Sequence, residues 1–206
     1  VPEVPGLAGG RAGGAGPVGL RGILADPAFR RAGRPNRMAL PIGRGTGGVV
    51  VTADLAGLRH LLIAGSAGSG SREWLAALVC ALAAQNTPES LRLVLVEPAR
   101  TRPSPFEGLP HLMAGAARAA DEAMGALRWL SVELDERRRR LAEARVPDLA
   151  SLNASRARPR EALPRIAVIV DDMADLMGQC TEEVEPRIAR LAQLGPEAGI
   201  HLVLSA

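Results

Sequence analysis

Residues 59–84 read RHLLIAGSAGSGSREWLAALVCALAA. A short apolar run (60–64) enters a glycine-rich turn, and a helical pattern follows that places five apolar side chains on one face: Trp74, Leu75, Leu78, Val79 and Leu82. A strand, a glycine-rich loop and a helix in this order are typical of a phosphate-binding loop, whose backbone N–H groups and helix N-terminus attract an anion. The candidate phosphate-binding residues are Gly65, Ser66, Ala67, Gly68, Ser69, Gly70, Ser71 and Arg72.

The loop departs from the full motif, G-x-x-x-x-G-K-S/T. Gly65 and Gly70 have the required spacing, but Ser71 and Arg72 follow them. The lysine that neutralises the outer phosphates is therefore missing, and so is the hydroxyl group that ligates magnesium. The sequence retains the scaffold of the site and lacks part of its chemistry.

Composition restricts the function only loosely. The chain has 206 residues, enough for one α/β domain with a substantial core, and its 25 basic residues are all arginine, with a net charge of +3. This small charge does not establish nucleic-acid binding. The start at Val1 and the end after an apolar strand suggest a piece of a longer protein. We expect Cys80 to be a buried free thiol, and no apolar run approaches the length of a membrane span.

The order of apolar strands and amphipathic helices predicts an α/β fold. Strands are expected at residues 38–42, 48–52, 91–96, 166–170 and 200–204, and helices at 22–31, after residue 70, at 119–144 and at 184–194. The glycine-rich segment 43–48 has no helix after it, which favours a hairpin turn over a second phosphate site. Alternation of this kind predicts a mostly parallel sheet with helices on both faces. Ligands of such sheets bind at the carboxyl ends of the strands.

Asp171 and Asp172 follow an apolar strand and should face the same crevice as the loop. As catalytic residues, Asp171 would hold magnesium and Asp172 would orient or activate the attacking water. The alternative is that an aspartate here caps the next helix.

Arginines are concentrated late in the expected helix 119–144 and after it. They could contact DNA phosphates, or they could form a solvated helix face neutralised by nearby acidic residues. Charge counting alone favours the solvated face. The arginines of the helix are residues 137–140, and their acidic neighbours are Glu133, Asp135, Glu136 and Glu143. His60, His111 and His201 lack the spacing of a metal site and are expected to be structural.

These segments together resemble the motor domain of the FtsK/SpoIIIE family of DNA translocases. The resemblance covers residues 20–206 and rests on LRGILADPAFR (20–30), ALPIGRGTGGVVVTADLAGLRHLLIAGSAGSG (39–70), FEGLPHL (106–112), ALRWLSVELDERR (126–138), VIVDDMADLM (168–177) and RLAQLGPEAGIHLVLSA (190–206). It implies a RecA-like P-loop NTPase fold, with residues 1–37 as a lead-in from the preceding motor subdomain and 38–206 as the truncated ATPase domain.

The resemblance also implies a function. ATP and Mg²⁺ would be the cofactors, and hydrolysis between the subunits of a homo-hexameric ring would drive double-stranded DNA through the pore during chromosome segregation or DNA transfer. Arg145, Arg156 and Arg158 would be the DNA-binding residues, by analogy with the family's pore loops. The segment would be cytoplasmic, with any membrane anchor in regions outside this chain.

Several departures from the family pattern limit this expectation. Besides Ser71 and Arg72, Asp172 stands where glutamate is usual, Glu97-Pro98-Ala99 stands in place of Asp-Pro-Lys, and Pro147 replaces an arginine. We therefore expect weak nucleotide binding and little or no hydrolysis. The alternatives are a non-hydrolysing structural subunit of an FtsK-like or secretion ATPase ring, and a protein that binds a different anion through the loop.

Overall fold

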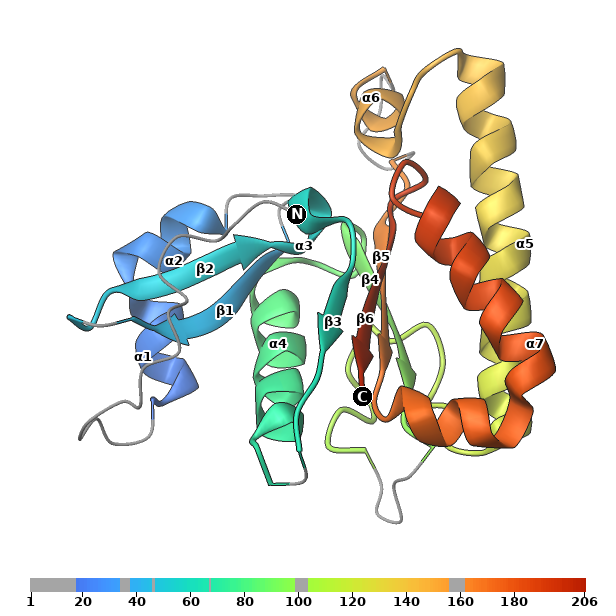
Figure 1. Ribbon diagram of the computed structural model, residues 1–206. Helices are drawn as coiled ribbons and strands as arrows, with labels where there is room; N and C mark the ends of the chain where they lie inside the picture. Colours follow the sequence, from blue (N-terminus) through green and yellow to red (C-terminus); the bar gives the residue numbers. More distant parts are fainter. Residues whose placement is uncertain (1–17, 34–37, 46, 67, 99–103, 156–161) are drawn as a thin grey trace.

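A parallel four-stranded sheet forms the centre of the computed structural model (Figure 1), which describes residues 18–33, 38–45, 47–66, 68–98, 104–155 and 162–206. The strands lie in the order β3 (Leu61–Ile63), β6 (Ile200–Ser205), β5 (Arg165–Val170) and β4 (Leu91–Val96). In the register of the sheet, Ile63 pairs with Ser205, Leu204 with Val170, and Val170 with Val96. The carboxyl ends of all four strands therefore meet at one edge.

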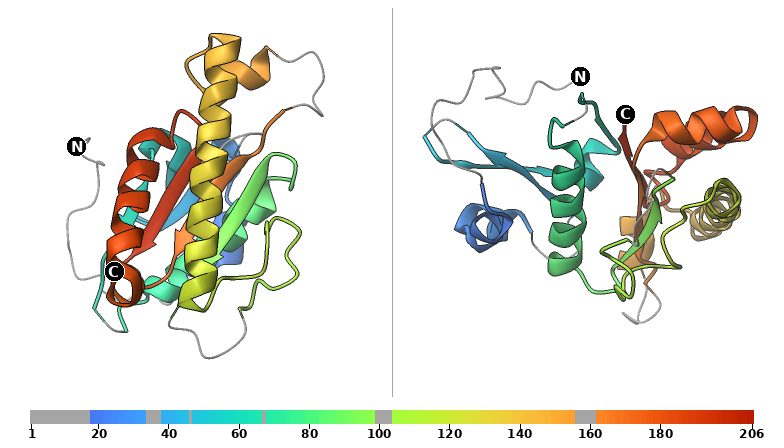
Figure 2. Two further views of the ribbon diagram at one scale, coloured as in Figure 1. Left: turned by 90° about the vertical axis from the view of Figure 1, so that its right-hand side faces the viewer. Right: turned by 90° about the horizontal axis from the view of Figure 1, so that it is seen from below.

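Helices cover both faces of this sheet, as Figures 1 and 2 show. Helix α4 (Ser71–Gln85) packs on one face, and α5 (Ala120–Ala144) and α7 (Met173–Leu194) pack on the other. Alternate residues of β5 point to the two sides: Ile166, Val168 and Val170 enter the core under α5 and α7, and Ala167 and Ile169 enter the core under α4. Burial on both faces explains why β5 reads as a continuous apolar run. The predicted α/β class with a mostly parallel sheet is confirmed.

An antiparallel hairpin of β1 (Ala39–Arg44) and β2 (Val50–Asp54) extends the α4 side, so the glycine-rich segment between them is a hairpin turn as predicted. The short helix α3 (Leu55–Leu58) follows it. Two short helices, α1 (Leu20–Ala25) and α2 (Pro27–Ala32), precede β1, where one helix was expected. The break falls at Asp26, which caps α2, because proline at the next position is compatible only with the start of a helix.

Three further expectations about the helices need correction. Helix α7 begins at Met173 and not near residue 184, because Asp172 caps it and Pro186 is accommodated inside it. A short helix, α6 (Leu149–Ala154), lies in a segment for which no helix was predicted. Cys80 is exposed and not buried, because α4 turns its other side toward the sheet. In the part of the chain that the structure describes, no helix combines the length and apolar character needed to cross a membrane.

Candidate nucleotide-binding site

The glycine-rich loop leaves β3 at the carboxyl edge of the sheet and leads into α4. Of its predicted phosphate-binding residues, Ala67 lies outside the described residues. The Gly65 N–H donates to the carbonyl of Ala206 at 3.2 Å, and the Ser69 N–H donates to the carbonyl of Ser66 at 3.0 Å. Gly68 and Gly70 have φ values of +79° and +89°, a left-handed conformation that favours glycine. The spacing of glycines in the sequence therefore corresponds to a backbone that needs them.

The first turn of α4 is the part of the loop suited to an anion. Gly70 is the N-cap residue and has no side chain that could accept a hydrogen bond from the first N–H groups of the helix. These donors are left for solvent or a ligand, and the helix dipole adds a partial positive charge at the same place. Ser71 begins the helix, where the full motif has lysine. The candidate anion site thus consists of backbone groups with no lysine ammonium group.

Asp171 lies in the same site, directly after β5. Its side chain is only 5 % exposed, and the Nε of Arg72 donates to its Oδ2 at 3.2 Å. The Oγ of Ser205, the last residue of β6, donates to its Oδ1 at 3.1 Å. The structure therefore brings the loop and Asp171 together across 99 positions in the sequence, as the parallel topology predicts.

Asp172 has a different environment from Asp171. Its backbone is left-handed, with φ +66°, and its N–H donates to the Oγ of Ser205 at 3.0 Å. Its Oδ1 accepts from the N–H of Asp175 at 3.0 Å and so caps α7. This contact is the capping role described above as the alternative to catalysis. A catalytic role for Asp172 stays a prediction.

Two parts of this arrangement were not predicted from the sequence. Ser205 connects the two aspartates, since its hydroxyl group donates to one side chain and accepts from the backbone of the next residue. The contact between Arg72 and Asp171 was also not predicted, because the two residues lie 99 positions apart in the sequence. The sequence feature that could have identified Ser205 is its position: it is a hydroxyl residue at the end of an apolar strand, and that strand lies next to the one that ends in the aspartates.

Magnesium does not fit the donor set of this site. Mg²⁺ needs oxygen ligands, which phosphate loops supply through a hydroxyl group and an aspartate. Here Arg72 takes the hydroxyl position and its guanidinium group already contacts Asp171. Nor do the described residues contain a group of three or more His, Cys, Asp or Glu side chains arranged to hold a metal ion.

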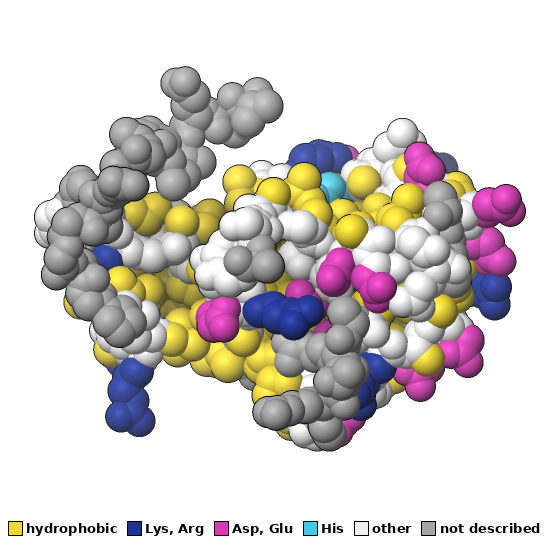
Figure 3. All heavy atoms as spheres, turned by 60° about the horizontal axis from the view of Figure 1, so that its bottom comes forward, with side chains coloured by type: hydrophobic (Ala, Val, Ile, Leu, Met, Phe, Trp, Pro, Cys, Tyr) yellow, Lys and Arg dark blue, Asp and Glu magenta, His cyan; other side chains and the backbone are white. Residues whose placement is uncertain are grey.

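Acidic and basic side chains lie side by side on the face of the molecule that includes this edge of the sheet (Figure 3). A cavity among the described residues lies away from this edge. It has a volume of about 490 Å³, lies between β4, the segment 113–117 and α5, and is lined mostly by apolar side chains such as Trp129. None of its lining residues belongs to the loop or to the aspartate pair.

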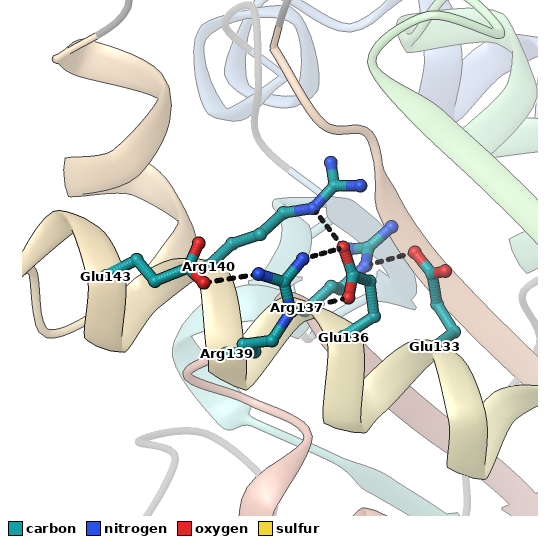
Figure 4. A network of polar contacts seen from close by, with 6 residues as sticks. All are labelled: Glu133, Glu136, Arg137, Arg139, Arg140 and Glu143. Atoms are coloured by element: carbon teal, nitrogen blue, oxygen red, sulfur yellow. Dashed lines mark hydrogen bonds and ion pairs between the residues drawn. The ribbon is translucent and has the colours of Figure 1, made fainter.

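Arginines on α5 are mostly engaged with acidic neighbours (Figure 4). Arg139 pairs with Glu136 and Glu143, and Arg140 pairs with Glu136. Hydrogen bonds from these two arginines lower the pKa of Glu136 to about 2. For these residues, the interpretation as a neutralised, solvated face agrees with the structure.

Arg137 differs from the rest of this run because it is buried, with 2 % exposure. It donates to Glu133 and to the carbonyl oxygens of Pro164 and Ala198, at 2.7, 2.8 and 3.0 Å. Burial lowers the pKa of Arg137, and the contact with Glu133 opposes this shift. Arg137 is therefore a structural residue of the core and no DNA contact.

The three predicted DNA-binding arginines cannot all be located. Arg145 is the exposed C-cap residue of α5, at the end of that helix next to α6 and far from the loop (Figure 1). Arg156 and Arg158 lie outside the described residues. The structure thus places Arg145 toward the edge of the sheet opposite the candidate nucleotide site.

The three histidines have structural partners, as predicted. The Nε2 of His60 contacts the carbonyl of Ala192 and its Nδ1 accepts from the N–H of Leu202, at 2.8 and 2.9 Å. His111 and His201 contact the carbonyls of Asn86 and Arg59, each at 2.8 Å. Burial lowers the pKa of both His60 and His201.

Comparison with known proteins gives consistent matches. The FtsK/SpoIIIE family profile matches residues 20–206. The DNA translocase FtsK of Clostridium tetani is 34 % identical over 191 residues, which are 92 % of this chain and 25 % of the relative. DNA translocase FtsK 1 of Neisseria meningitidis is 33 % identical in an alignment of 208 positions that covers 91 % of this chain and 25 % of the relative. The chain therefore spans about a quarter of the length of these curated relatives.

Solved structures show the same fold. The cytoplasmic domain of the type VII secretion ATPase EccC of Thermomonospora curvata superposes with a TM-score of 0.68 at 26 % identity. The match covers 83 % of this chain and 21 % of that chain. The fold is that of a RecA-like P-loop NTPase domain.

Proposed function

The chain belongs to the FtsK/SpoIIIE family, and from this membership we propose that it is the nucleotide-binding segment of a double-stranded DNA translocase motor whose ATP hydrolysis is impaired. The observation that carries the proposal is the contact between Arg72 and Asp171, which joins the loop to the aspartate strand in one site. Residues 38–206 would form the ATPase domain and residues 1–37 the lead-in.

ATP would bind with its phosphates on the backbone N–H groups at the start of α4, at residues 70–72, because the N–H groups of Gly65 and Ser69 already donate within the loop and to Ala206. A backbone cradle binds phosphate without lysine, but it lacks the charge-assisted contact that the lysine of the full motif makes with the outer phosphates. Ser71 is neutral and cannot replace that contact. Binding is therefore weak, and the charge that develops on the transferred phosphoryl group in the transition state is poorly stabilised.

Hydrolysis also needs a positioned water molecule and a carboxylate to orient it. Asp171 is committed to Arg72 and Ser205, and Oδ1 of Asp172 is committed to capping α7. Both carboxylates thus have structural partners that compete with a catalytic role. This competition and the missing lysine support the same conclusion, that turnover is slow or absent.

A reconstructed loop tests the proposal. The wild-type chain should bind a fluorescent ATP analogue weakly and hydrolyse ATP little above background. The double variant Ser71→Lys with Arg72→Thr should gain about 100-fold in turnover. The new lysine places a positive charge beside the outer phosphates, and the loss of the arginine releases Asp171. Adding Asp171→Asn to the double variant should abolish the gain.

The outcomes separate the two parts of the proposal. Wild-type turnover as fast as that of the double variant, and abolished by Asp171→Asn, would show that hydrolysis is not impaired. Absence of nucleotide binding in both the wild type and the double variant would refute the nucleotide site itself. A variant that melts at least 10 °C below the wild type would be replaced by the single change Ser71→Lys.

The same contact favours a second candidate function, a non-hydrolysing subunit that retains the ring-forming fold. The secretion ATPase EccC has this fold, so a role in a secretion assembly belongs to the same candidate. A DNA motor segment should bind both ATP and double-stranded DNA, whereas a structural subunit should self-associate without turnover and without DNA. Sedimentation with and without DNA distinguishes the two, and a hexamer is the expected assembly for either.

A further inference from the structure

The Arg72–Asp171 pair has the form of a cation site in which an arginine replaces the metal ion. Asp171 is the buried member and Arg72 the exposed one, with side-chain exposures of 5 % and 53 %. The guanidinium group bonds through Nε, and the described residues offer it no second hydrogen bond or ion pair. Its exposed Nη groups can therefore donate to a ligand held on the loop.

We propose that this site binds a nucleotide polyphosphate without a divalent cation, with the Arg72 guanidinium group in place of the metal. The inference rests on the proposed nucleotide site and goes beyond it by stating which form of the nucleotide is bound. In an intact phosphate loop, the hydroxyl residue and the aspartate hold Mg²⁺ beside the outer phosphates. Here the position of the hydroxyl residue supplies a fixed positive charge, and Asp171 orients that charge.

Charge decides between the metal-bound and metal-free forms of the ligand. A guanidinium group attracts free phosphate oxygens and can bind two of them through its planar donors. A nucleotide that carries Mg²⁺ would bring a dication close to the guanidinium group, and like charges at such a distance repel. Asp171 offsets this repulsion less than a free carboxylate would, because its negative charge is already shared with the Arg72 guanidinium group and the Ser205 hydroxyl group.

The inference reverses the usual effect of magnesium. We expect the wild-type chain to bind ATP at least about threefold more tightly in EDTA than in excess Mg²⁺. Arg72→Thr restores the hydroxyl group and releases Asp171, so that Mg²⁺ should strengthen ATP binding in this variant. Arg138→Thr is the matched control: it removes an exposed arginine on α5, far from the loop, and should preserve the wild-type response to magnesium.

The experiment is a titration of each protein with a fluorescent ATP analogue, in EDTA and in excess Mg²⁺, accompanied by electron paramagnetic resonance of Mn²⁺ with and without ATP. The expected result is protein-bound Mn²⁺ only for Arg72→Thr. Tighter wild-type binding in Mg²⁺, or Mn²⁺ bound to the wild type and lost in Asp171→Asn, would overturn the inference and leave the nucleotide site intact. Absence of wild-type binding under both conditions would refute the nucleotide site and the inference together. If Arg72→Thr does not fold, the wild-type comparison alone decides.

Discussion

His201 is a buried residue whose protonation state should affect the stability of the fold. It lies on β6 with 2 % exposure, and its Nδ1 donates to the carbonyl of Arg59. Its Nε2 is buried and has no hydrogen-bond partner among the described residues. A second proton on this ring would therefore be buried without an acceptor, which is why burial lowers the pKa of His201 to about 4.

The stability of the chain should fall in mild acid because of this residue. An unfolded histidine has a pKa near 6.5, so the unfolded state binds more protons than the folded state between pH 6.5 and 4. The contribution of neutral His201 to the unfolding free energy is complete above pH 6.5 and is lost as the pH falls toward 4. Between pH 7 and 5 the expected loss is about 2 kcal/mol of unfolding free energy.

The measurement is chemical denaturation at pH 7, 6 and 5. His201→Gln does not titrate and retains an N–H donor for Arg59, so its unfolding free energy should change about 2 kcal/mol less over this range than that of the wild type. Carboxylates titrate in both proteins, and their effect cancels in the comparison. Equal pH dependence in the two proteins would contradict the prediction.

At the scale of single residues, the sequence was most informative about backbone conformation. Gly68 and Gly70 were identifiable because only glycine adopts their left-handed conformation easily. The partner of Arg72 was not identifiable, because it lies 99 positions away. Burial of Cys80 was predicted wrongly, because an apolar neighbourhood in sequence does not fix which side of a helix a residue occupies.

Among the elements, helix α5 carries arginines of opposite character at neighbouring positions. Arg137 is buried and donates to two main-chain carbonyls as well as to Glu133, whereas Arg138 is exposed. The carbonyls belong to Pro164 and Ala198, the segments that lead into β5 and β6. Arg137 therefore connects α5 to the sheet, and α5 positions β5 and the aspartates that follow it.

We predict that Arg137→Gln destabilises the chain by about 3 kcal/mol, because it leaves Glu133 and a buried carbonyl without their donors. Arg138→Gln is the control at the next position and should change the unfolding free energy by less than about 0.5 kcal/mol. Denaturant titration of both variants measures the difference. Equal effects would mean that the arginine run acts only as a charged surface.

Prediction of the elements succeeded where one hydrophobic period continued without interruption. The strands 91–96 and 166–170 and the helix 119–144 were located within one or two residues. Helix α7 was predicted too short, because the polar segment 178–183 and Pro186 interrupt its apolar pattern while tertiary packing maintains it. The division into α1 and α2 depended on a cap at Asp26, a local signal that outweighed the apolar positions on both sides.

At the scale of the whole molecule, the parallel topology brings the candidate site together. Because neighbouring strands run in the same direction and in register, the residues after β3, β5 and β6 must meet at one edge. This part of the site was predictable from the order of elements alone. The orientation of Asp172 was not, because its left-handed backbone and its cap on α7 are local features.

The opposite edge of the sheet is where the proposed DNA contact can be tested. Arg145 ends α5 there, is exposed, and makes no ion pair with the described residues, whereas Arg139 on the same helix is held by Glu136 and Glu143. A cation without an acidic neighbour is available to a phosphate, and a neutralised cation contributes little. Arg145 should therefore contribute to DNA affinity and Arg139 should not.

Arg145→Asn is the appropriate change, because asparagine tolerates the left-handed backbone (φ +55°) found at this position. We expect its affinity for double-stranded DNA to fall about three- to tenfold, and the slope of log affinity against log salt to become shallower by about 1. Fluorescence anisotropy of a labelled duplex over a series of salt concentrations measures both quantities, with Arg139→Asn as the matched control. The reconstructed loop variant should bind DNA like the wild type when no nucleotide is present, because the two sites lie at opposite edges of the sheet. If the salt dependence of Arg145→Asn equals that of the control, the DNA-binding surface of this chain does not include the end of α5.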